Sequence, residues 1–497
     1  MSSFSLLLEG FAVALRPLNL AFALGGVGVG TVVGMLPGIG PINAIAILLP
    51  VIFAVGLPAE SALILLAGIY YGSQYGNSIS TILLNVPGTT SSVVTAIDGY
   101  PLTQQGKAGP ALATAAIASF VGGTLSIFGL VLLAPLLASW ALRFGPAEYV
   151  ALMALAFAAL SSFSGGSFPK ALVATGVGLL LASVGLDPNS SVARFTFGEL
   201  RLLDGLDFVV VTIGLFAISE VFLLLERTGA GEAAATRVGR VGLTMKELAF
   251  SGWSMLRGSV IGFLMGVLPG AGGTVSTFVA YGAEQRISDR EGTFGKGDLR
   301  GVAAPEAANN AAATGALIPL LTLGVPGSAT TAVLLGALMG LNVTPGPLLL
   351  ERNPEVFWGL VASMYIGNLF LLALNLPLVR VFVRVLSVPR WILVPGIAAL
   401  GCVAVYAVNG SVFDLFLMVG FGVAGYGFRK VGIPLAPVIL GLVLGPLMEK
   451  NLRRALALGG GDWSVLVSSP LAVGIWGVTL AVLALPLVGA MRARRQG

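Results

Sequence analysis

Gly30-Thr-Val-Val-Gly-Met-Leu-Pro-Gly-Ile-Gly40 occurs twice in the chain, returning as Gly262-Phe-Leu-Met-Gly-Val-Leu-Pro-Gly-Ala-Gly272 with six of the eleven positions identical. A second pair of elements follows, Val86-Pro-Gly-Thr-Thr-Ser-Ser92 and Val325-Pro-Gly-Ser-Ala-Thr-Thr331. Proline removes a backbone donor and glycine permits the turn that follows, so each element predicts a break in a helix. Two Pro-Gly elements in the same order and at similar spacing indicate an internal repeat.

The composition places this repeat in a membrane. Of 497 residues, 56% are hydrophobic and 10% are charged, and the mean hydropathy is +0.96. A soluble chain carries about 25% charged residues. The 69 glycines and 27 prolines suit closely packed and broken membrane helices. At about 20 residues a span, the apolar runs predict an all-α polytopic membrane protein with about ten to twelve transmembrane helices.

The domain organisation follows from the repeat. We expect a first membrane repeat over residues 1–235 and a second over 236–497, the second with additional C-terminal helices. Several apolar runs beside the Pro-Gly elements are too short to span a bilayer, which predicts two inverted-topology repeats with discontinuous or re-entrant helices. The basic stretch from Glu226 to Arg257 predicts a cytoplasmic link. Near 429–464, basic clusters at both ends of a short apolar run leave the topology open.

We expect the substrate-binding residues of the chain to lie at the helix breaks. Unpaired backbone groups are costly in lipid, so we expect the breaks to be buried in protein or to line a wet cavity. A helix that begins after a break points N–H groups and its positive dipole end into that cavity, and four such ends predict an anion site near the midplane. Alternatively, these residues only kink helices and the hydroxyls bond their own backbone. Beside the structural prolines Pro37, Pro87, Pro269 and Pro326, the predicted substrate-binding residues are Gly38, Gly40, Asn43, Asn85, Thr89, Thr90, Ser91, Gly270, Gly272, Gly273, Thr274, Ser276, Ser328 and Thr330.

Another polar cluster lies between the two breaks of each half. If residues 304–310 are helical, Glu306 shares a face with Asn309 and Asn310, and Pro305 fits the first helical turn. A carboxylate with two amides could bind a cation or a proton, or close a gate. Alternatively, Glu306 satisfies a helix N-terminus at the surface. The candidates for ion coupling or gating are Tyr71, Gln74, Asn77, Glu306, Asn309 and Asn310.

Other classes of function find little support. The absence of histidine excludes His-based triads and His-ligated metal sites, and we predict no catalytic residue and no metal site. No Walker A motif is present, which argues against direct coupling to ATP. Gly459-Gly-Gly-Asp462 is similar to an element of intramembrane aspartyl proteases, but it has no partner aspartate deep in a span. We therefore expect a protein that is not an enzyme and that moves a small solute.

The chain resembles a known family, the large permease subunits of tripartite tricarboxylate transporters. The resemblance covers nearly the whole chain. It rests on Gly34-Met-Leu-Pro-Gly-Ile-Gly-Pro41, Tyr70-Tyr-Gly-Ser-Gln-Tyr-Gly76, Asn85-Val-Pro-Gly-Thr89, Asp98-Gly-Tyr-Pro101, Leu268-Pro-Gly-Ala-Gly-Gly273, Gly301-Val-Ala-Ala-Pro-Glu-Ala-Ala-Asn-Asn310, Gly324-Val-Pro-Gly-Ser328, Pro434-Leu-Ala-Pro437, Gly445-Pro446 and Asn451-Leu-Arg-Arg454.

The resemblance implies a symporter of the bacterial inner (cytoplasmic) membrane, a secondary active importer of carboxylates such as citrate with an elevator-like, inverted-repeat fold. It implies no cofactor, and a sodium ion or a proton as the coupling ion. The implied partners are a small four-span membrane subunit and a periplasmic solute-binding protein, with no nucleic acid. The alternatives are an uncoupled channel, which would need no binding protein, or another secondary transporter for small anions.

Overall fold

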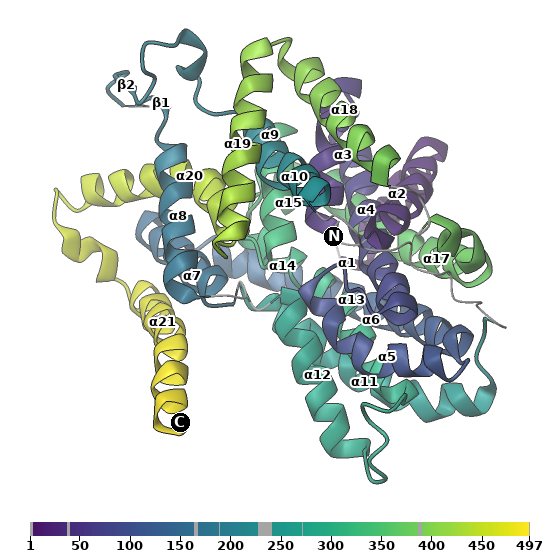
Figure 1. Cartoon of the computed structure of the whole chain (residues 1–497). Coiled ribbons are helices and arrows are strands. Elements are labelled where there is room, and N and C mark those ends of the chain that lie inside the picture. Colours follow the sequence, from purple (N-terminus) through teal and green to yellow (C-terminus); the bar gives the residue numbers. More distant parts are fainter. Residues whose placement is uncertain are drawn as a thin grey trace.

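The structure is a computed structural model that describes residues 3–36, 40–163, 167–187, 189–226, 241–270, 272–385 and 390–496. These residues are helical almost throughout (Figure 1), and the strands among them form one short antiparallel pair, β1 (Gly185–Leu186) and β2 (Ala193–Arg194). The predicted all-α class is confirmed. The expected boundary between the repeats, at 235/236, lies outside the described residues.

The helices of the first half are α1 (Ser3–Ala14), α2 (Pro17–Met35), α3 (Pro41–Val55), α4 (Ala59–Leu84), η1 (Thr90–Ser92), α5 (Val93–Gln104), α6 (Ala108–Ala141), α7 (Pro146–Phe163), α8 (Phe168–Ala182), η2 (Leu200–Leu202), α9 (Phe208–Thr212), the π-helix η3 (Ile213–Ile218) and α10 (Ser219–Glu226). The second half contains α11 (Met245–Val267), α12 (Gly272–Ser288), α13 (Leu299–Gly315), α14 (Leu317–Leu323), α15 (Ala329–Gly340), α16 (Leu349–Arg352), α17 (Pro354–Val385), α18 (Arg390–Asn409), α19 (Val412–Lys430), α20 (Ala436–Leu458), η4 (Trp463–Val467) and α21 (Pro470–Gln496). In Figure 1, α14 and α15 lie between a group formed by α7, α8 and α20 and a group formed by α2, α4 and α17.

The four Pro-Gly elements interrupt helices. The interruptions fall between α2 and α3, between α4 and η1, between α11 and α12, and between α14 and α15. Pro37 and Gly38 lie outside the described residues. Because one helix ends before each element and another begins after it, the four breaks are observed. The inversion of the repeats and the re-entrant course of the helices stay predictions.

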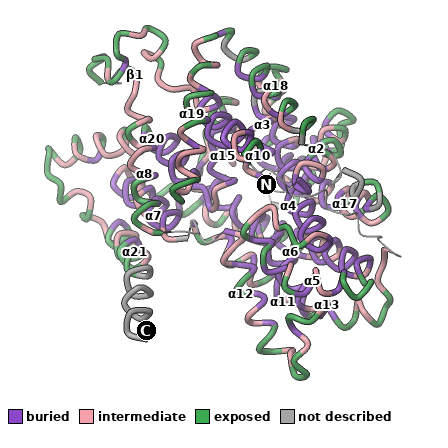
Figure 2. The backbone as a smooth tube through the Cα atoms, viewed as in Figure 1, coloured by how far each residue is buried: buried purple, intermediate pink, exposed green. Residues whose placement is uncertain are grey.

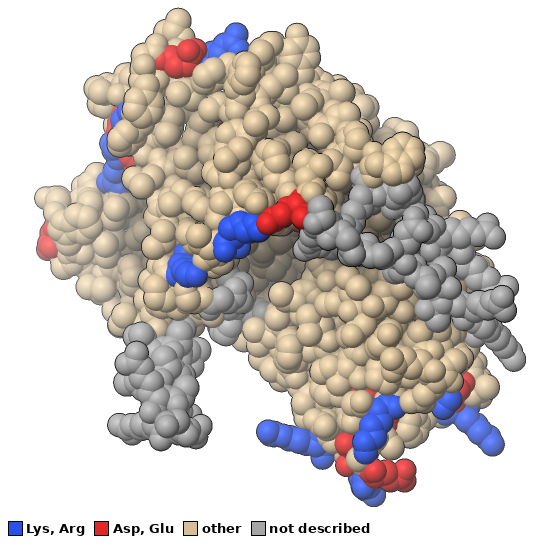
Figure 3. All heavy atoms as spheres, viewed as in Figure 1, with Lys and Arg blue, Asp and Glu red and all other residues tan. Residues whose placement is uncertain are grey.

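Six helical segments of the described chain are long and apolar enough to cross a membrane: Pro17–Met35, Ala108–Ala141, Phe208–Glu226, Met245–Val267, Pro354–Val379 and Val412–Lys430. This number is lower than the about ten to twelve spans expected from length, and the larger number stays a prediction. Breaks shorten several apolar helices, and α4 and α13 carry polar side chains. Figure 3 shows charged atoms in a few places, with one group at the end of the molecule formed by the loop between α12 and α13, a row across the middle of this face, and wide uncharged areas between them.

The two polar helices α4 and α13 lie in the interior (Figure 2). Every residue of α13 from Gly301 to Gly315 is buried, and α4 is buried from Ser61 to Leu83 apart from Leu65. Lipid would penalise the side chains that these helices carry, so a membrane protein covers such helices with others.

Glycine stripes pack these two helices against their neighbours in the same way in both halves. A Cβ at Gly30 of α2 would lie 2.4 Å from the carbonyl oxygen of Ile69 in α4, and a Cβ at Gly262 of α11 would lie 2.3 Å from that of Ala308 in α13. Only glycine leaves room for backbones this close, so the packing supports the internal repeat. The adjacent turns repeat the contact, with Gly26 and Gly34 on Leu65 and Ser73, and Gly258 and Gly266 on Ala304 and Ala312.

We expect Gly30→Ala and Gly262→Ala each to lower the stability of the full chain by about 1–3 kcal/mol, because the added methyl group forces two packed backbones apart. Thermal unfolding in detergent measures the change. Gly28→Ala on α2 and Gly252→Ala on α11 are matched controls, since a Cβ at either position meets nothing within 4 Å. Equal unfolding midpoints for all four variants would contradict the close packing.

Candidate functional site

A cavity of about 450 Å³ lies where the breaks meet. Its described lining comes from the starts of α3, α12 and α15, from α4, from η1 and the residues before it, from α7 and η3, and from the stretch between the end of α19 and the start of α20. We call it the break cavity. It joins segments of both halves of the chain.

Most of the predicted substrate-binding residues lie around this cavity. The structure places Asn85 and Ser276 elsewhere: Asn85 is the exposed, left-handed residue that ends α4, and Ser276 is buried and donates to the carbonyl of Gly272, 2.6 Å away in its own helix. Gly38 lies outside the described residues. The eleven predicted residues in the lining are Gly40, Asn43, Thr89, Thr90, Ser91, Gly270, Gly272, Gly273, Thr274, Ser328 and Thr330.

The backbone of the breaks explains the glycines. Gly270 and Gly272 have φ angles of +80° and +53°, in the left-handed region that favours glycine. The N–H of Gly270 donates to the carbonyl oxygen of Gly327 at 2.9 Å, which joins the two breaks of the second half directly. A Cβ at Gly270 would lie 2.3 Å from the carbonyl carbon of Ala159 in α7, so a bulky residue there would disturb the fold as well as the cavity.

The electrostatics of the break cavity favour an anion. The helices α3 and α15 begin at the cavity with Gly40 and Ser328 as N-caps, and no side chain caps α3. A helix N-terminus carries a partial positive charge and free N–H groups. The described lining holds no carboxylate, and its one formally charged residue is Arg429.

Hydroxyl groups of the two halves meet at the cavity. The Oγ1 atoms of Thr90 and Thr274 lie 2.6 Å apart, and Thr89 Oγ1 pairs with Ser91 Oγ at 3.0 Å. A hydroxyl can donate or accept, so each of these groups can exchange its present partner for a carboxylate oxygen. The hydroxyls therefore bond side chains across the breaks as well as their own backbone.

The second polar cluster is assembled around Glu306, which is buried. Its two carboxylate oxygens accept hydrogen bonds from Ser78 and Thr95 of the first half, each at 2.6 Å. The surface alternative for Glu306 is wrong, because α13 begins at Leu299 and Glu306 lies well inside it. Pro305 is likewise inside the helix and not in its first turn.

Three of the predicted coupling or gating residues have buried amide atoms without a partner among the described residues. The atoms concerned are Nδ2 and Oδ1 of Asn77 and the Oδ1 atoms of Asn309 and Asn310. A Cβ at Gly88 would lie 1.9 Å from Asn77 Oδ1, and one at Gly273 would lie 2.8 Å from Asn309 Oδ1, so both amides abut the breaks. Buried amide oxygens without partners are suited to a hard cation. The ion-coupling role stays a prediction.

The other two predicted coupling or gating residues are in hydrogen bonds. Gln74 lines the break cavity and its Oε1 accepts from Asn309 Nδ2 at 3.4 Å, while the hydroxyl of Tyr71 pairs with that of Thr314 at 2.5 Å. Asn310 Nδ2 donates to Ser119 at 2.7 Å. Each of these three hydrogen bonds joins the two halves of the chain. Such bonds are equally consistent with a gate and with a purely structural contact between the halves.

Asp98 is a buried residue that is absent from the set of functional residues predicted from the sequence. Its Oδ1 accepts the backbone N–H groups of Gly295, Gly297 and Asp298, each at 2.9 Å, and its Oδ2 accepts the hydroxyl of Tyr281 at 2.8 Å. The carboxylate thereby ties α5 of the first half to the loop between α12 and α13 of the second. Its signal in the sequence was its place in Asp98-Gly-Tyr-Pro101, one of the motifs on which the family resemblance rests.

Asp298 continues this network at the start of α13. Burial raises its pKa, but hydrogen bonds from Arg300 and Thr293 outweigh this and hold the pKa below its usual value. The guanidinium of Arg300 also lies over the ring of Phe250, 4.3 Å from its centroid. The loop is therefore held by ionised groups at neutral pH.

We expect Asp98→Leu to destabilise the chain by at least about 3 kcal/mol, because three buried N–H groups lose their acceptor and each such loss costs about 1–3 kcal/mol. Amide hydrogen exchange of residues 293–298 in the full chain reports the loss directly. Asp462→Leu is the control, since Asp462 caps η4 on an exposed loop and its loss costs about 1 kcal/mol. Unchanged protection of 293–298 in Asp98→Leu would contradict this anchoring role.

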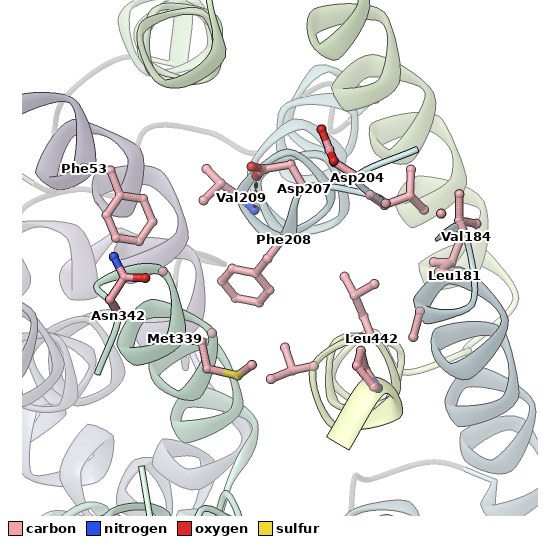
Figure 4. A pocket seen from close by; sticks show the side chains of 18 of the residues that line it. Phe53, Leu181, Val184, Asp204, Asp207, Phe208, Val209, Met339, Asn342 and Leu442 are labelled. Atoms are coloured by element: carbon pink, nitrogen blue, oxygen red, sulfur yellow. Dashed lines mark hydrogen bonds between the residues drawn. The ribbon is translucent and has the colours of Figure 1, made fainter. Parts of the chain in front are cut away.

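A larger cavity of about 790 Å³ lies elsewhere in the protein. Figure 4 shows the side chains of Phe53, Phe208, Met339 and Leu442 around the hollow. These residues come from α3, α9, α15 and α20. Apolar side chains therefore form part of the wall of this cavity.

The charges of the larger cavity disfavour an anion. Its described lining holds three carboxylates, those of Asp204, Asp207 and Glu449, against the one guanidinium of Arg194. Arg194 is paired with Glu449 at 2.9 Å, and Asp207 caps α9. Volume favours this cavity, but we regard the break cavity as the candidate site because its charges and hydroxyls suit a small anion.

Arg429 is the lining residue that sequence reasoning could not place. It lies near the end of α19, far along the chain from every break. It pairs with Glu220 of α10, and its Nη2 donates to the carbonyl oxygen of Phe216 at 3.5 Å. The predicted substrate-binding residues include no arginine, and only the tertiary fold brings this guanidinium to the breaks.

Comparisons with known proteins agree with these observations. Residues 20–440 match the family model described as the tripartite tricarboxylate transporter TctA family. An uncharacterized 52.8 kDa protein in the TAR-I ttuC' 3'region of Agrobacterium vitis is 43% identical over 486 residues, covering 98% of this chain and 96% of that protein. An uncharacterized protein in the TAR-II ttuC' 3'region of the same organism is 42% identical over 234 residues, covering 47% of this chain and 97% of that protein. No solved structure matches.

Proposed function

The chain belongs to the tripartite tricarboxylate transporter TctA family, and we propose that it is the large permease subunit of a secondary active transporter that imports carboxylates. It is a multi-pass membrane protein of a transporter family, which is not an enzyme family. The proposed substrate is a tricarboxylate or related organic acid such as citrate. The proposed location is the bacterial inner membrane.

One observation carries this proposal: segments beside the breaks of both halves enclose a single cavity whose lining suits an anion. The cavity collects helix N-termini, hydroxyl groups and one arginine, and no carboxylate among its described residues. Backbone N–H groups and dipole ends at broken helices are the recurring way in which transporters hold an anionic group. The break cavity would therefore hold the carboxylate groups of the substrate.

The driving force we propose is a gradient of sodium ions or protons. The buried oxygens of Asn77 and Asn309 lie against the breaks and have no partner within the described part of the chain, and the carboxylate of Glu306 lies in the same interior cluster. A coupling cation bound among them would offset the charge of a carboxylate in the break cavity. We propose no other cofactor. The proposed protein partners are a small four-span membrane subunit and a periplasmic solute-binding protein, in line with the word tripartite in the family description.

We expect Thr90→Val and Thr274→Val each to lower carboxylate uptake about tenfold, the loss expected for one hydrogen bond to a charged group. Valine keeps the shape of threonine and removes only the hydroxyl. The measurement is uptake of radiolabelled citrate and succinate by proteoliposomes that hold the full chain with both proposed partners, under an imposed sodium or proton gradient.

Thr114→Val is the matched control, because its hydroxyl bonds the carbonyl of Pro110 in its own helix, away from the cavity. Its uptake should equal that of the wild type. If the wild-type complex took up no organic acid under either gradient, the proposed function would fail. Flux that ran without any gradient or binding protein would indicate a channel instead.

A further inference from the structure

We propose that Arg429 is an anion-recognition residue of the break cavity and binds one carboxylate group of a substrate that carries at least two. This inference rests on the proposed function and adds a charge requirement to it. Arg429 is the one formally charged residue in the described lining. Helix N-termini and hydroxyl groups around it can hold a carboxylate, but they carry only partial charges.

The fold fixes the position of Arg429 tightly. A Cβ at Gly422 would lie 2.4 Å from a side-chain carbon of Ile218, and one at Gly425 would lie 2.7 Å from the carbonyl oxygen of Leu215, so α19 is pressed against η3. Arg429 follows Gly425 by one helical turn on the same face. It therefore reaches the cavity beside Phe216, which also lines it.

The contacts of Arg429 leave capacity for a ligand. An arginine has five N–H donors in a planar fork, and the contacts to Glu220 and Phe216 engage Nη1 and Nη2. Glu220 is buried, with 2% of its surface exposed, and its Oε1 has no partner among the described residues. The segment that presents both Phe216 and Glu220 contains the π-helix η3, a conformation that is frequent at functional sites.

Glu220 is the residue that competes with a ligand for Arg429. The negative charge of Glu220 holds the guanidinium of Arg429 in place. It also opposes an incoming anion, because Glu220 and the anion compete for the N–H donors of Arg429. A carboxylate is well matched to the arginine fork. Removing the charge of Glu220 while keeping its shape should therefore strengthen anion binding. A purely structural ion pair predicts the opposite, since its loss would only loosen α19.

The next residue provides a matched comparison. Lys430 pairs with Glu226 at the same end of α19, and both side chains are about half exposed, at 45% and 47%. Neither residue lines the break cavity. Lys430→Gln therefore removes an ion pair and a positive charge from the same helix end without touching the proposed site.

The test is binding of succinate and of butanoate, which have equal chain lengths and differ by one carboxylate, to the purified full chain in lipid nanodiscs by calorimetry. We expect Arg429→Gln to weaken succinate binding about tenfold or more and to change butanoate binding by less than about threefold. Arg429→Lys should restore part of the succinate affinity, Glu220→Gln should increase it, and Lys430→Gln should leave it unchanged.

Three results would overturn the inference: equal effects of Arg429→Gln on both anions, an effect of Lys430→Gln as large as that of Arg429→Gln, or weaker succinate binding by Glu220→Gln. The last result keeps the test decisive even if Arg429→Gln fails to fold. If the wild-type chain binds succinate and citrate but the variants behave in one of these ways, only the role of Arg429 fails. If the wild type binds no carboxylate, the carboxylate-binding function fails and this inference with it.

Discussion

The hydrogen bond from the N–H of Gly270 to the carbonyl of Gly327 joins two breaks, and it represents the constraint on which the whole structure depends. Backbone groups freed at a Pro-Gly element find no water in a bilayer, so they must meet protein or a wet cavity. Gathering the breaks in one place satisfies some of these groups with each other and turns others toward a shared space. The same requirement explains why glycine and small hydroxyl residues crowd there.

A second consequence is that the polar helices must be enclosed. The helices α4 and α13 carry the amides, the tyrosines and Glu306, and apolar helices pack around them through glycine stripes. The two halves contribute differently to this interior: the second supplies the carboxylate of Glu306, and the first supplies the hydroxyls of Ser78 and Thr95 that bind it. The repeat therefore gives a common frame, and differences between its copies give the polar cluster its chemistry.

Much of the site could be predicted from local sequence, because proline and glycine act on their own backbone. The paired motifs predicted four helix breaks, and eleven of the predicted substrate-binding residues lie in the lining of the break cavity. Local spacing failed where the start of a helix was misjudged: α13 begins with Asp298 as its N-cap, which puts Pro305 and Glu306 inside it. Local spacing could not predict that Arg429 lines the cavity, because the position of Arg429 depends on how α19 packs against η3.

The central claim is that the breaks of both halves form one binding cavity for a carboxylate. The most direct test is a cryo-electron microscopy map of the full chain in lipid nanodiscs with saturating citrate. We expect ligand density in the break cavity, within hydrogen-bonding distance of Thr90, Thr274 or Ser328 and next to Arg429. Density in the larger cavity beside Phe208, with the break cavity empty, would contradict this account.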